Sequence, residues 1–347
     1  MTGHTGFKGS WLSVWLNKLG ADAFGIALEP NTTPNAFEAL DLKSICHHQI
    51  LDIRSRENVA RAVKEINPEV VFHMAAQPLV RDSYTAPIET YETNVMGTTH
   101  LLYSLSSCNS VRSIVIITTD KCYENREWSW PYRETDALGG YDPYSSSKAC
   151  AEIVTASFRR SFFSNANKVG IATVRAGNVI GGGDWSRDRL IPDIVRSLQD
   201  GATLEIRNPD SIRPWQHVLA PLSGYLTLAE KLWVDPKKYS EPFNFAPTDE
   251  DCVPVRVLLD FFGSAWGTPI KCNEGISTQQ RHEANLLKLD ASKAKQILGW
   301  KTPWNLADAL HATASWYRCY YENPANIRQL TLKQIEDFHL GTGSHGA

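Results

Sequence analysis

The sequence predicts an α/β fold, in which a doubly wound parallel sheet carries helices on both faces and a smaller mixed α/β lobe is attached to it. In the first half of the chain, short apolar runs alternate with amphipathic helical patterns. The apolar runs lack the alternation of a half-exposed strand, which indicates strands that are buried on both faces. Beyond residue 177 the pattern changes to loops rich in glycine and proline with shorter helices.

The expected elements follow one another in a regular order. Leucine and tryptophan recur at helical spacing over residues 9–19, and Ser55, a residue type that caps helix N-termini, opens a later helix. Further helices are expected over residues 94–105, 144–163, 191–198 and 255–262. Buried strands are expected over residues 23–28, 70–74, 113–118 and 169–174. Strand and helix therefore alternate as they do in a parallel sheet.

Composition and charge exclude several classes of protein. The chain has 347 residues, of which 42% are hydrophobic, and a formal net charge of -3. A nonspecific nucleic-acid binder would carry a surplus of basic residues, so no nucleic-acid partner is expected. No apolar run reaches the roughly 18 residues of a membrane span, and the chain opens without a secretory leader. We therefore expect a cytoplasmic protein without a membrane partner. The seven cysteines are scattered singly, and no metal site is expected.

The chain opens on a glycine loop, with Gly3, Gly6 and Gly9 spaced as GxxGxxG around Phe7 and Lys8. Such glycines let backbone N–H groups approach a pyrophosphate at a helix N-terminus. Because a helix and then a strand follow, the loop predicts a dinucleotide site.

Glu29 lies at the end of the strand that follows the loop and its helix. An acidic side chain there hydrogen-bonds a ribose hydroxyl and repels a 2′-phosphate, which favours NAD over NADP. The alternative is that Glu29 is a solvated loop carboxylate. The small residues Ala75 and Ala76, with Gln77, end another strand and permit close approach of a cofactor.

The glycine loop lacks the strand that normally precedes it, because only Met1 and Thr2 stand before Gly3. We therefore expect the first strand of the sheet to be missing and the natural chain to start about ten residues upstream. A sheet without its central strand would leave backbone N–H and C=O groups of the neighbouring strands unpaired.

Tyr144 and Lys148 stand four residues apart on a predicted helix, so the phenol and the ammonium share one face. The ammonium is expected to lower the tyrosine pKa, so that the phenolate accepts a hydroxyl proton near neutral pH. Thr119 ends a buried strand, at the edge where such sheets bind ligands, and could bond the same substrate oxygen.

The motifs together resemble the extended short-chain dehydrogenases/reductases that act on nucleotide sugars, and within them the CDP-glucose 4,6-dehydratases. The resemblance covers essentially the whole chain. It is carried by residues 3–12 (GHTGFKGSWL), 73–81 (HMAAQPLVR), 93–98 (TNVMGT), 119–123 (TDKCY), 139–148 (GGYDPYSSSK), 175–185 (RAGNVIGGGDW) and 212–218 (IRPWQHV). The last two segments are far more specific than the glycine loop.

The resemblance implies a hydro-lyase with tightly bound NAD and a homodimer as the assembly. The substrate it implies is CDP-glucose, converted to CDP-4-dehydro-6-deoxy-D-glucose and water as an early step toward bacterial surface polysaccharide. It implies a Rossmann-like NAD-binding domain over residues 1–177 with a returning segment at about 215–247. A substrate lobe over 178–214 and 248–335, and a frayed tail over 336–347, complete the expected division.

The resemblance also implies residue roles. Asp120 is the expected acid for the departing C6 hydroxyl, and must carry a proton to act so. Lys121 stands where related dTDP-glucose dehydratases carry glutamate; it acts either as the C5 base or as an electrostatic stabiliser of an enolate, and both possibilities stay open. Further cofactor contacts are implied at Asp52, Ile53, Asn94, Tyr144 and Lys148, and substrate contacts at Asn178, Arg189, Arg213 and His217.

Three alternatives share the fold. A 4-epimerase would use the same cofactor and the Tyr144–Lys148 pair but needs no acid and base to expel water, so Asp120 and Lys121 favour dehydration. A substrate that carries dTDP or GDP in place of CDP remains possible. An inactive, N-terminally truncated NAD-binding protein is the third possibility.

Overall fold

The computed structural model describes residues 1–163, 168–206, 208–274 and 286–341. Its centre is a parallel sheet in the order β2–β1–β3–β4–β5–β10, in which Thr2 bridges β1 and β3. The strands of the sheet are β1 (Phe24–Ala27), β2 (His47–Ile50), β3 (Val70–His73), β4 (Ser113–Ile117), β5 (Gly170–Ala176) and β10 (Pro242–Phe245). Every pair within it is parallel, for example Ser113 opposite Gly170 in β4 and β5.

The place of the expected first strand is held by Met1 and Thr2. The Thr2 amide donates to the Phe72 carbonyl at 2.9 Å, and the Ile26 amide donates to the Met1 carbonyl at 3.0 Å. Thr2 thus forms single bridges to Ile26 and His73. The strand predicted to be missing is therefore reduced to one bridging residue, Thr2, which still joins the two halves of the sheet at the point where the strand order reverses.

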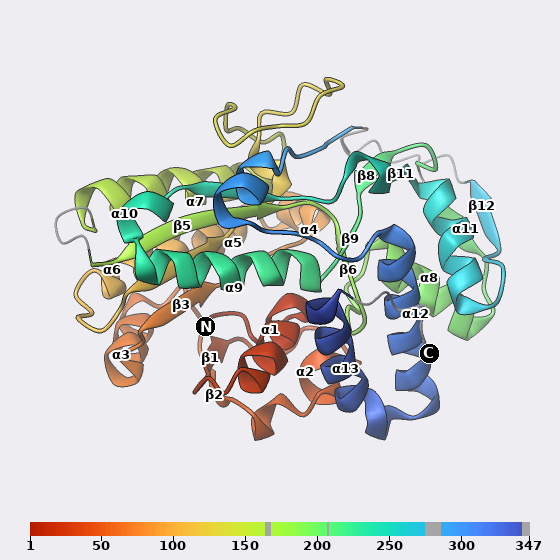
Figure 1. Ribbon diagram of the computed structural model, residues 1–347, viewed down its shortest axis with the longest axis horizontal. Helices are drawn as coiled ribbons and strands as arrows, with labels where there is room; N and C mark the ends of the chain where they lie inside the picture. The colour runs from red at the N-terminus through yellow and green to blue at the C-terminus, as the bar shows by residue number, and fades with distance from the viewer. Residues whose placement is uncertain (164–167, 207, 275–285, 342–347) are drawn as a thin grey trace.

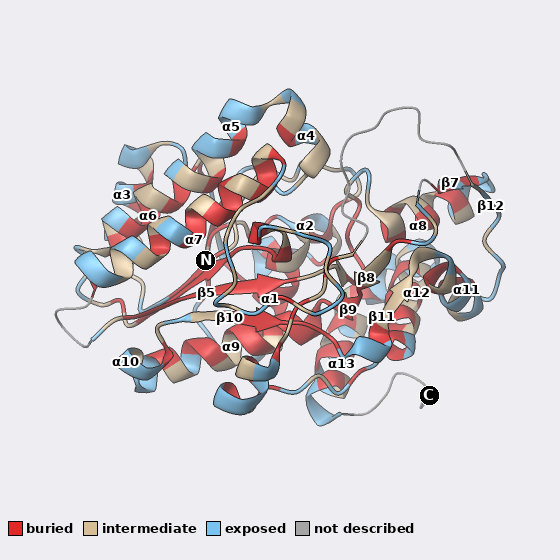
Figure 2. Ribbon diagram, turned by 90° about the horizontal axis from the view of Figure 1, so that it is seen from above, coloured by how far each residue is buried: buried red, intermediate tan, exposed pale blue. Residues whose placement is uncertain are grey.

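Helices cover both faces of the sheet. Figure 2 shows α3, α6 and α7 on one side of the sheet and α9 on the other. Residues of β4 alternate between the two cores: Val115 and Ile117 pack on the side of α1 and α9, while Ile114 and Ile116 pack on the side of α3 and α6. The helices of this part are α1 (Phe7–Lys18), α2 (Ala36–Ala39), α3 (Arg56–Ile66), α4 (Val80–Thr85), α5 (Pro87–Tyr91), α6 (Gly97–Leu105), α7 (Pro143–Ser161), α9 (Leu219–Val234) and α10 (Pro236–Tyr239).

The helix predicted over residues 94–105 is interrupted at its start. Residues Glu92–Met96 form one wide π turn, η2, and α6 begins at Gly97. In this turn the buried Asn94 amide bonds the backbone of Gln77 and the hydroxyl of Ser147. A π turn inserts an extra residue into the helix and is common at functional sites.

The smaller lobe lies to the right in Figure 1. Its helices are α8 (Leu190–Asp200), α11 (Val255–Trp266), α12 (Leu306–Glu322) and α13 (Ile327–Leu340). Its short strands are β6 (Val179–Ile180), β7 (Leu204–Ile206), β8 (Ile212–Pro214), β9 (Gln216–His217), β11 (Cys252–Pro254) and β12 (Cys272–Glu274). The remaining short turns are η1 (Leu42–Ser44), η3 (Asp120–Cys122), η5 (Asp249–Asp251), η6 (Ala294–Leu298) and η7 (Pro324–Asn326).

Residues 336–340, expected to be part of a frayed tail, instead complete α13. Phe338 is 3% exposed, and its ring packs edge-on against Trp15 and Trp304. Burial of this aromatic side chain stabilises the last turn of the helix, which corrects the prediction. Residues 342–347, the rest of that segment, lie outside the described residues.

Among the described residues, no helix is long and apolar enough to cross a membrane. The same part of the chain holds no cluster of His, Cys, Asp or Glu side chains that could bind a metal ion.

Candidate active site

The glycine loop leads directly into the N-terminus of α1, at the carboxyl edge of the sheet. Gly3 has a φ of +76°, and a Cβ there would lie 2.6 Å from the Ala75 amide nitrogen. A Cβ on Gly9 would lie 2.1 Å from the Gly3 carbonyl oxygen. These two positions therefore require glycine, because the loop packs against its own backbone and against the loop after β3.

The start of α1 suits a diphosphate. In the described chain, Gly6 caps the helix without a side-chain hydrogen bond, and no acidic residue stands in the first turn. A Cβ on Gly6 would meet only the Gly3 carbonyl, at 3.5 Å, so the space beside the loop is open. Free N–H groups and the helix dipole favour an anion at this position. The residues present therefore fit the pyrophosphate of a dinucleotide.

The other predicted cofactor residues lie along the same edge of the sheet. Glu29 is exposed just beyond β1. Asp52 follows β2, and its carboxylate is paired with Arg54 at 2.6 Å; this hydrogen bonding lowers the pKa of Asp52. Ile53 is buried against Gly97. Ala75, Ala76 and Gln77 follow β3, where Thr2 Oγ1 accepts hydrogen bonds from the Met74 and Ala75 amides.

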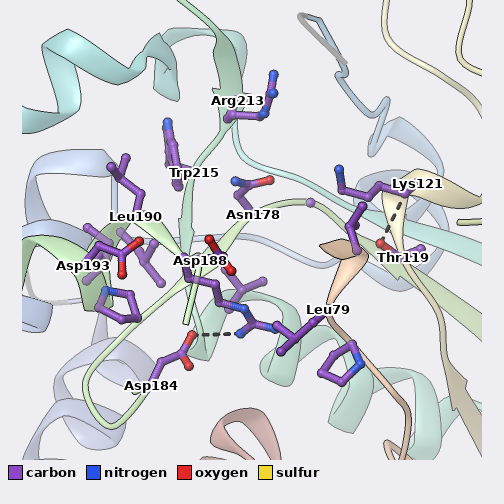
Figure 3. A pocket seen from close by; sticks show the side chains of 18 of the residues that line it. Leu79, Thr119, Lys121, Asn178, Asp184, Asp188, Leu190, Asp193, Arg213 and Trp215 are labelled. Carbon is purple, nitrogen blue, oxygen red and sulfur yellow. Dashed lines mark hydrogen bonds and ion pairs between the residues drawn. The ribbon is translucent and has the colours of Figure 1, made fainter. Parts of the chain in front are cut away.

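A cavity of about 370 Å³ opens between the sheet edge and the smaller lobe. Figure 3 shows Lys121, Asn178 and Arg213 around the same space, with Thr119 below Lys121 in this view. The structure thus brings together most of the predicted catalytic and substrate residues, although they come from distant parts of the chain. The predicted site residues that line the cavity are Phe7, Lys8, Thr119, Asp120, Lys121, Tyr144, Asn178, Arg189 and Arg213.

Tyr144 lies at the start of α7, where Asp142 caps the helix by accepting from the Ser145 amide at 2.9 Å. The phenol is 8% exposed, and burial raises the pKa of Tyr144 to about 12. The neighbouring Thr119 hydroxyl opposes this rise, as does the charge of Arg189. Thr119 therefore lies where the sequence placed it, beside the phenol.

Lys148 lies one turn further along α7. Its Nζ donates to the Ile117 carbonyl at 3.1 Å, at the end of β4, and burial lowers the pKa of Lys148 to about 8. The lowering of the Tyr144 pKa by this ammonium, expected from the spacing, stays a prediction.

Asp120 begins the short turn η3 that follows Thr119. Its carboxyl is 4% exposed, and burial raises the pKa of Asp120 despite the cations of Lys121, Arg213 and Lys8. Loss of hydration disfavours the charged carboxylate, so a proton is retained to higher pH than usual. This is the direction that a proton donor requires.

Two arginines line the side of the cavity formed by the smaller lobe. Arg189 precedes α8 and pairs with Asp184 at 2.8 Å, while Arg213 lies on β8. A further pair across the entrance, Arg81 with Asp188 at 3.0 Å, was not predicted. Its only sequence signal was the presence of Arg81 at the end of the HMAAQPLVR segment.

His217 is placed in the core, which corrects its assignment to the substrate site. The residue is 2% exposed, and its ring packs against Trp11 and Trp304. Its Nδ1 accepts from the Leu219 amide at 3.3 Å, and burial lowers the pKa of His217 to about 3. Trp215 lines the cavity, whereas His217, two residues further along the chain, lies between the two tryptophan rings.

Comparison with known proteins agrees with this geometry. The family model described as GDP-mannose 4,6 dehydratase matches residues 1–239. A CDP-glucose 4,6-dehydratase from Salmonella typhimurium is 52% identical over 347 residues, which cover 99% of this chain and 96% of the relative.

Two solved structures share the fold. The dTDP-glucose 4,6-dehydratase from Streptomyces venezuelae, solved with NAD bound, has a TM-score of 0.76 and 23% identity, covering 95% of this chain and 98% of its own. A UDP-glucose 4-epimerase from Thermotoga maritima, solved with UDP-glucose, has a TM-score of 0.79 and 22% identity, covering 92% and 98%. Because the family model spans more than half of the chain and the Salmonella relative nearly all of it, the chain belongs to the GDP-mannose 4,6 dehydratase family, and within it to the branch of the CDP-glucose 4,6-dehydratases.

Proposed function

We propose that this protein is an NAD-dependent CDP-glucose 4,6-dehydratase, which forms CDP-4-dehydro-6-deoxy-D-glucose and water. The observation that carries the proposal is that one cavity holds both Tyr144 and the Asp120–Lys121 turn, in a chain half identical throughout to an enzyme of that name. Tyr144 serves the oxidation of an alcohol, and the Asp120–Lys121 turn serves the removal of water. The 4,6-dehydration needs both.

NAD fits the glycine loop and the open N-terminus of α1, and when bound it would take a hydride from C4 of the sugar and later return it to C6. Its diphosphate would lie at Gly6, Phe7 and Lys8. Glu29, exposed beyond β1, would hydrogen-bond the ribose hydroxyls and repel a 2′-phosphate. Asn94 fixes the loop after β3 through its bonds to Gln77.

Tyr144 acts in the first half of the reaction. Its phenolate accepts the proton of the C4 hydroxyl while the C4–H bond breaks, and Thr119 holds the same oxygen. In the free protein the phenol is protonated, because burial holds the pKa of Tyr144 at about 12. Arg189, which favours the phenolate, and Lys148, one turn away, supply positive charge on this side of the cavity.

Asp120 and Lys121 act in the second half, once C4 is a ketone and the C5 proton is acidic. The C5 proton is removed, the C6–O bond breaks, and Asp120 gives its proton to the departing hydroxyl, so that water leaves. Lys121 either accepts the C5 proton or stabilises the enolate charge. A proton then returns to C5 as C6 receives the hydride, so the reaction involves no net oxidation.

Substrate recognition is assigned to three residues around the cavity. Arg213 and Arg189 provide planar cations suited to the diphosphate. Asn178 follows β5 and faces the same space, where its amide can bond a sugar hydroxyl. A 4-epimerase would need Tyr144 but has no use for a protonated carboxyl beside it, so the buried Asp120 favours dehydration.

The test is to incubate the protein with CDP-glucose and, separately, with dTDP-, UDP- and GDP-sugars, and to analyse the products by mass spectrometry. Loss of one water with CDP-glucose alone is the expected result and supports reaction and nucleobase together. Loss of water with another nucleotide sugar would change the substrate. An inverted sugar of unchanged mass would identify an epimerase and refute the proposal.

We also infer a homodimer formed through α6 and α7. These helices and the neighbouring α5 carry apolar side chains at the surface: Ile88 is 69% exposed, Tyr103 50% and Ile153 58%. Exposed apolar side chains grouped on adjacent helices are typical of an interface. Light scattering on Ile153→Glu, compared with the unchanged protein, tests this. The cytoplasmic location stays a prediction.

A further inference from the structure

A buried ion pair lies behind the cavity, and no step of the proposed mechanism uses it. Glu152 stands on α7, one turn beyond Lys148, and Arg175 stands on β5; both side chains are 3% exposed. Arg175 donates from Nη2 to Oε2 at 2.9 Å and from Nε to Oε1 at 3.0 Å. The guanidinium and the carboxylate thus meet in a two-pronged geometry with high directional specificity.

Glu152 joins α7 to the middle of β5 and to the residue that follows β4. Besides Arg175, its carboxylate accepts from the Thr118 hydroxyl at 2.5 Å and from the Thr173 hydroxyl at 2.6 Å. Burial alone would raise the pKa of Glu152, but Arg175 and these hydroxyls hold it below its ordinary value. Thr118 directly precedes Thr119, so the carboxylate fixes the entry to the catalytic turn relative to the helix of Tyr144 and Lys148.

Arg175 reaches the other end of the same turn. Its Nη1 donates to Tyr123 Oη at 2.7 Å, and its guanidinium lies 4.8 Å from the centre of the Tyr123 ring. Tyr123 in turn donates to Asn244 on β10 at 2.8 Å. Tyr123 follows η3 directly, so the turn that carries Asp120 and Lys121 is held at its entry through Glu152 and at its exit through Arg175.

A buried ion pair is a poor source of stability, because desolvation of both charges offsets much of their attraction. This pair has instead a geometric consequence, since it is the shared anchor of the two groups that must act in turn on neighbouring carbons of one sugar. A displacement of about 1 Å in such a group can cost about a hundredfold in rate.

We propose that the Glu152–Arg175 pair is a positioning element that locks the Tyr144–Lys148 helix and the Asp120–Lys121 turn into one geometry, so that elimination follows C4 oxidation without release of the intermediate. The inference deepens the proposed function and rests on it. It assigns to Tyr123, through Arg175, control of the elimination half of the reaction.

Three variants separate the links. Tyr123→Phe removes the hydroxyl that receives Arg175 while keeping the ring and the ion pair. Arg175→Lys keeps the charge but loses the fork that reaches both Glu152 and Tyr123. Thr155→Val is the matched control: it removes an equally buried hydroxyl from α7, but that hydroxyl donates to the Ala151 carbonyl of its own helix.

The first readout is the position of the turn, measured without turnover by alkylation of cysteines and peptide mass spectrometry. Cys122 lies within η3 and is fully buried, Cys46 is buried far from it, and Cys272 is exposed. We expect Cys122 to be alkylated about tenfold faster in Tyr123→Phe and in Arg175→Lys, with Cys46 still protected. If Cys46 is also labelled in Arg175→Lys, that variant has unfolded globally. The comparison then rests on Tyr123→Phe.

The second readout is the fate of the cofactor during reaction with CDP-glucose. In Tyr123→Phe, C4 oxidation should continue while elimination slows by about tenfold or more, so reduced nicotinamide accumulates on the protein; Thr155→Val should not differ from the unchanged enzyme. If Tyr123→Phe neither exposes Cys122 nor accumulates reduced cofactor, the pair is only structural and the inference is wrong. If the unchanged protein does not dehydrate CDP-glucose, the proposed function fails, whereas the Cys122 result still tests the anchoring of the turn.

Discussion

Lys8 offers the sharpest test of the site, because its side chain extends from the glycine loop into the cavity. Burial, and after it the charges of Arg189 and Lys148, lower the pKa of Lys8 to about 7, while Asp120 opposes the change. The perturbation is Lys8→Met, which keeps an unbranched side chain of similar length and removes the titrating group. The prediction concerns proton uptake when a diphosphate binds beside it.

The magnitude follows from the pKa. At pH 8 a group with a pKa near 7 is charged in about one molecule in ten. A diphosphate nearby favours the charged form and moves the pKa back toward its ordinary value of 10.5, so Lys8 takes up about 0.9 proton on binding. Lys148, with a pKa of about 8, adds up to about half a proton. Uptake should therefore fall as the pH is lowered below 7, where both amines are already charged.

The assay is isothermal titration calorimetry of NAD into protein freed of bound nucleotide, at pH 8, in two buffers that differ in ionisation enthalpy. Wild-type protein should take up about one proton or slightly more, and Lys8→Met no more than about half a proton. Repeating the titration at pH 6 serves as the control, since uptake should nearly vanish. Equal uptake by the variant and the wild type at pH 8 would refute the assignment of Lys8 to the diphosphate.

Three further predictions concern single residues. Tyr144→Phe should block C4 oxidation, so that CDP-glucose produces no reduced nicotinamide although NAD still binds; reduction at the wild-type rate would remove Tyr144 from its role. Lys121→Ala should allow C4 oxidation but stall elimination, seen as reduced cofactor without loss of water from the sugar, and normal turnover would contradict this. Phe338→Ala should lower the free energy of unfolding in denaturant by about 3–5 kcal/mol, because a buried aromatic is lost. Leu340→Ala, at a residue 67% exposed in the same helix, is the control and should cost less than about 0.5 kcal/mol; equal losses would show that the end of α13 is not anchored.

Local patterns predicted the elements of the fold well where they were both apolar and periodic. The strand expected over 113–118 is β4 (Ser113–Ile117), and the helix expected over 144–163 is α7 (Pro143–Ser161). The end of α13 was predicted poorly, because Phe338 is buried by Trp15, which lies more than 300 positions earlier in the chain. A short polar segment gives no local sign of such a partner.

The residues of the candidate site also fall into those that could be placed from sequence and those that could not. Thr119, Asp120 and Lys121 could be placed from sequence, because residues that follow a buried parallel strand emerge at its ligand-binding edge. The burial of His217 between two tryptophans, and the contact of Lys148 with the Ile117 carbonyl, could not be predicted, since each depends on which way a side chain turns after packing.

The sequence by itself determined the alternation of strands and helices, the glycine loop, the identity of the residues available for acid–base chemistry, and the family. These are properties of spacing and residue type, which a linear chain carries explicitly. The tertiary structure alone decided which of those residues share a cavity, which carboxyl has its pKa raised by burial, and how the Glu152–Arg175 pair bonds Tyr123 and Thr118 around the catalytic turn. Desolvation and hydrogen-bond geometry depend on contacts between residues far apart in the chain, so they arise only when the chain has folded.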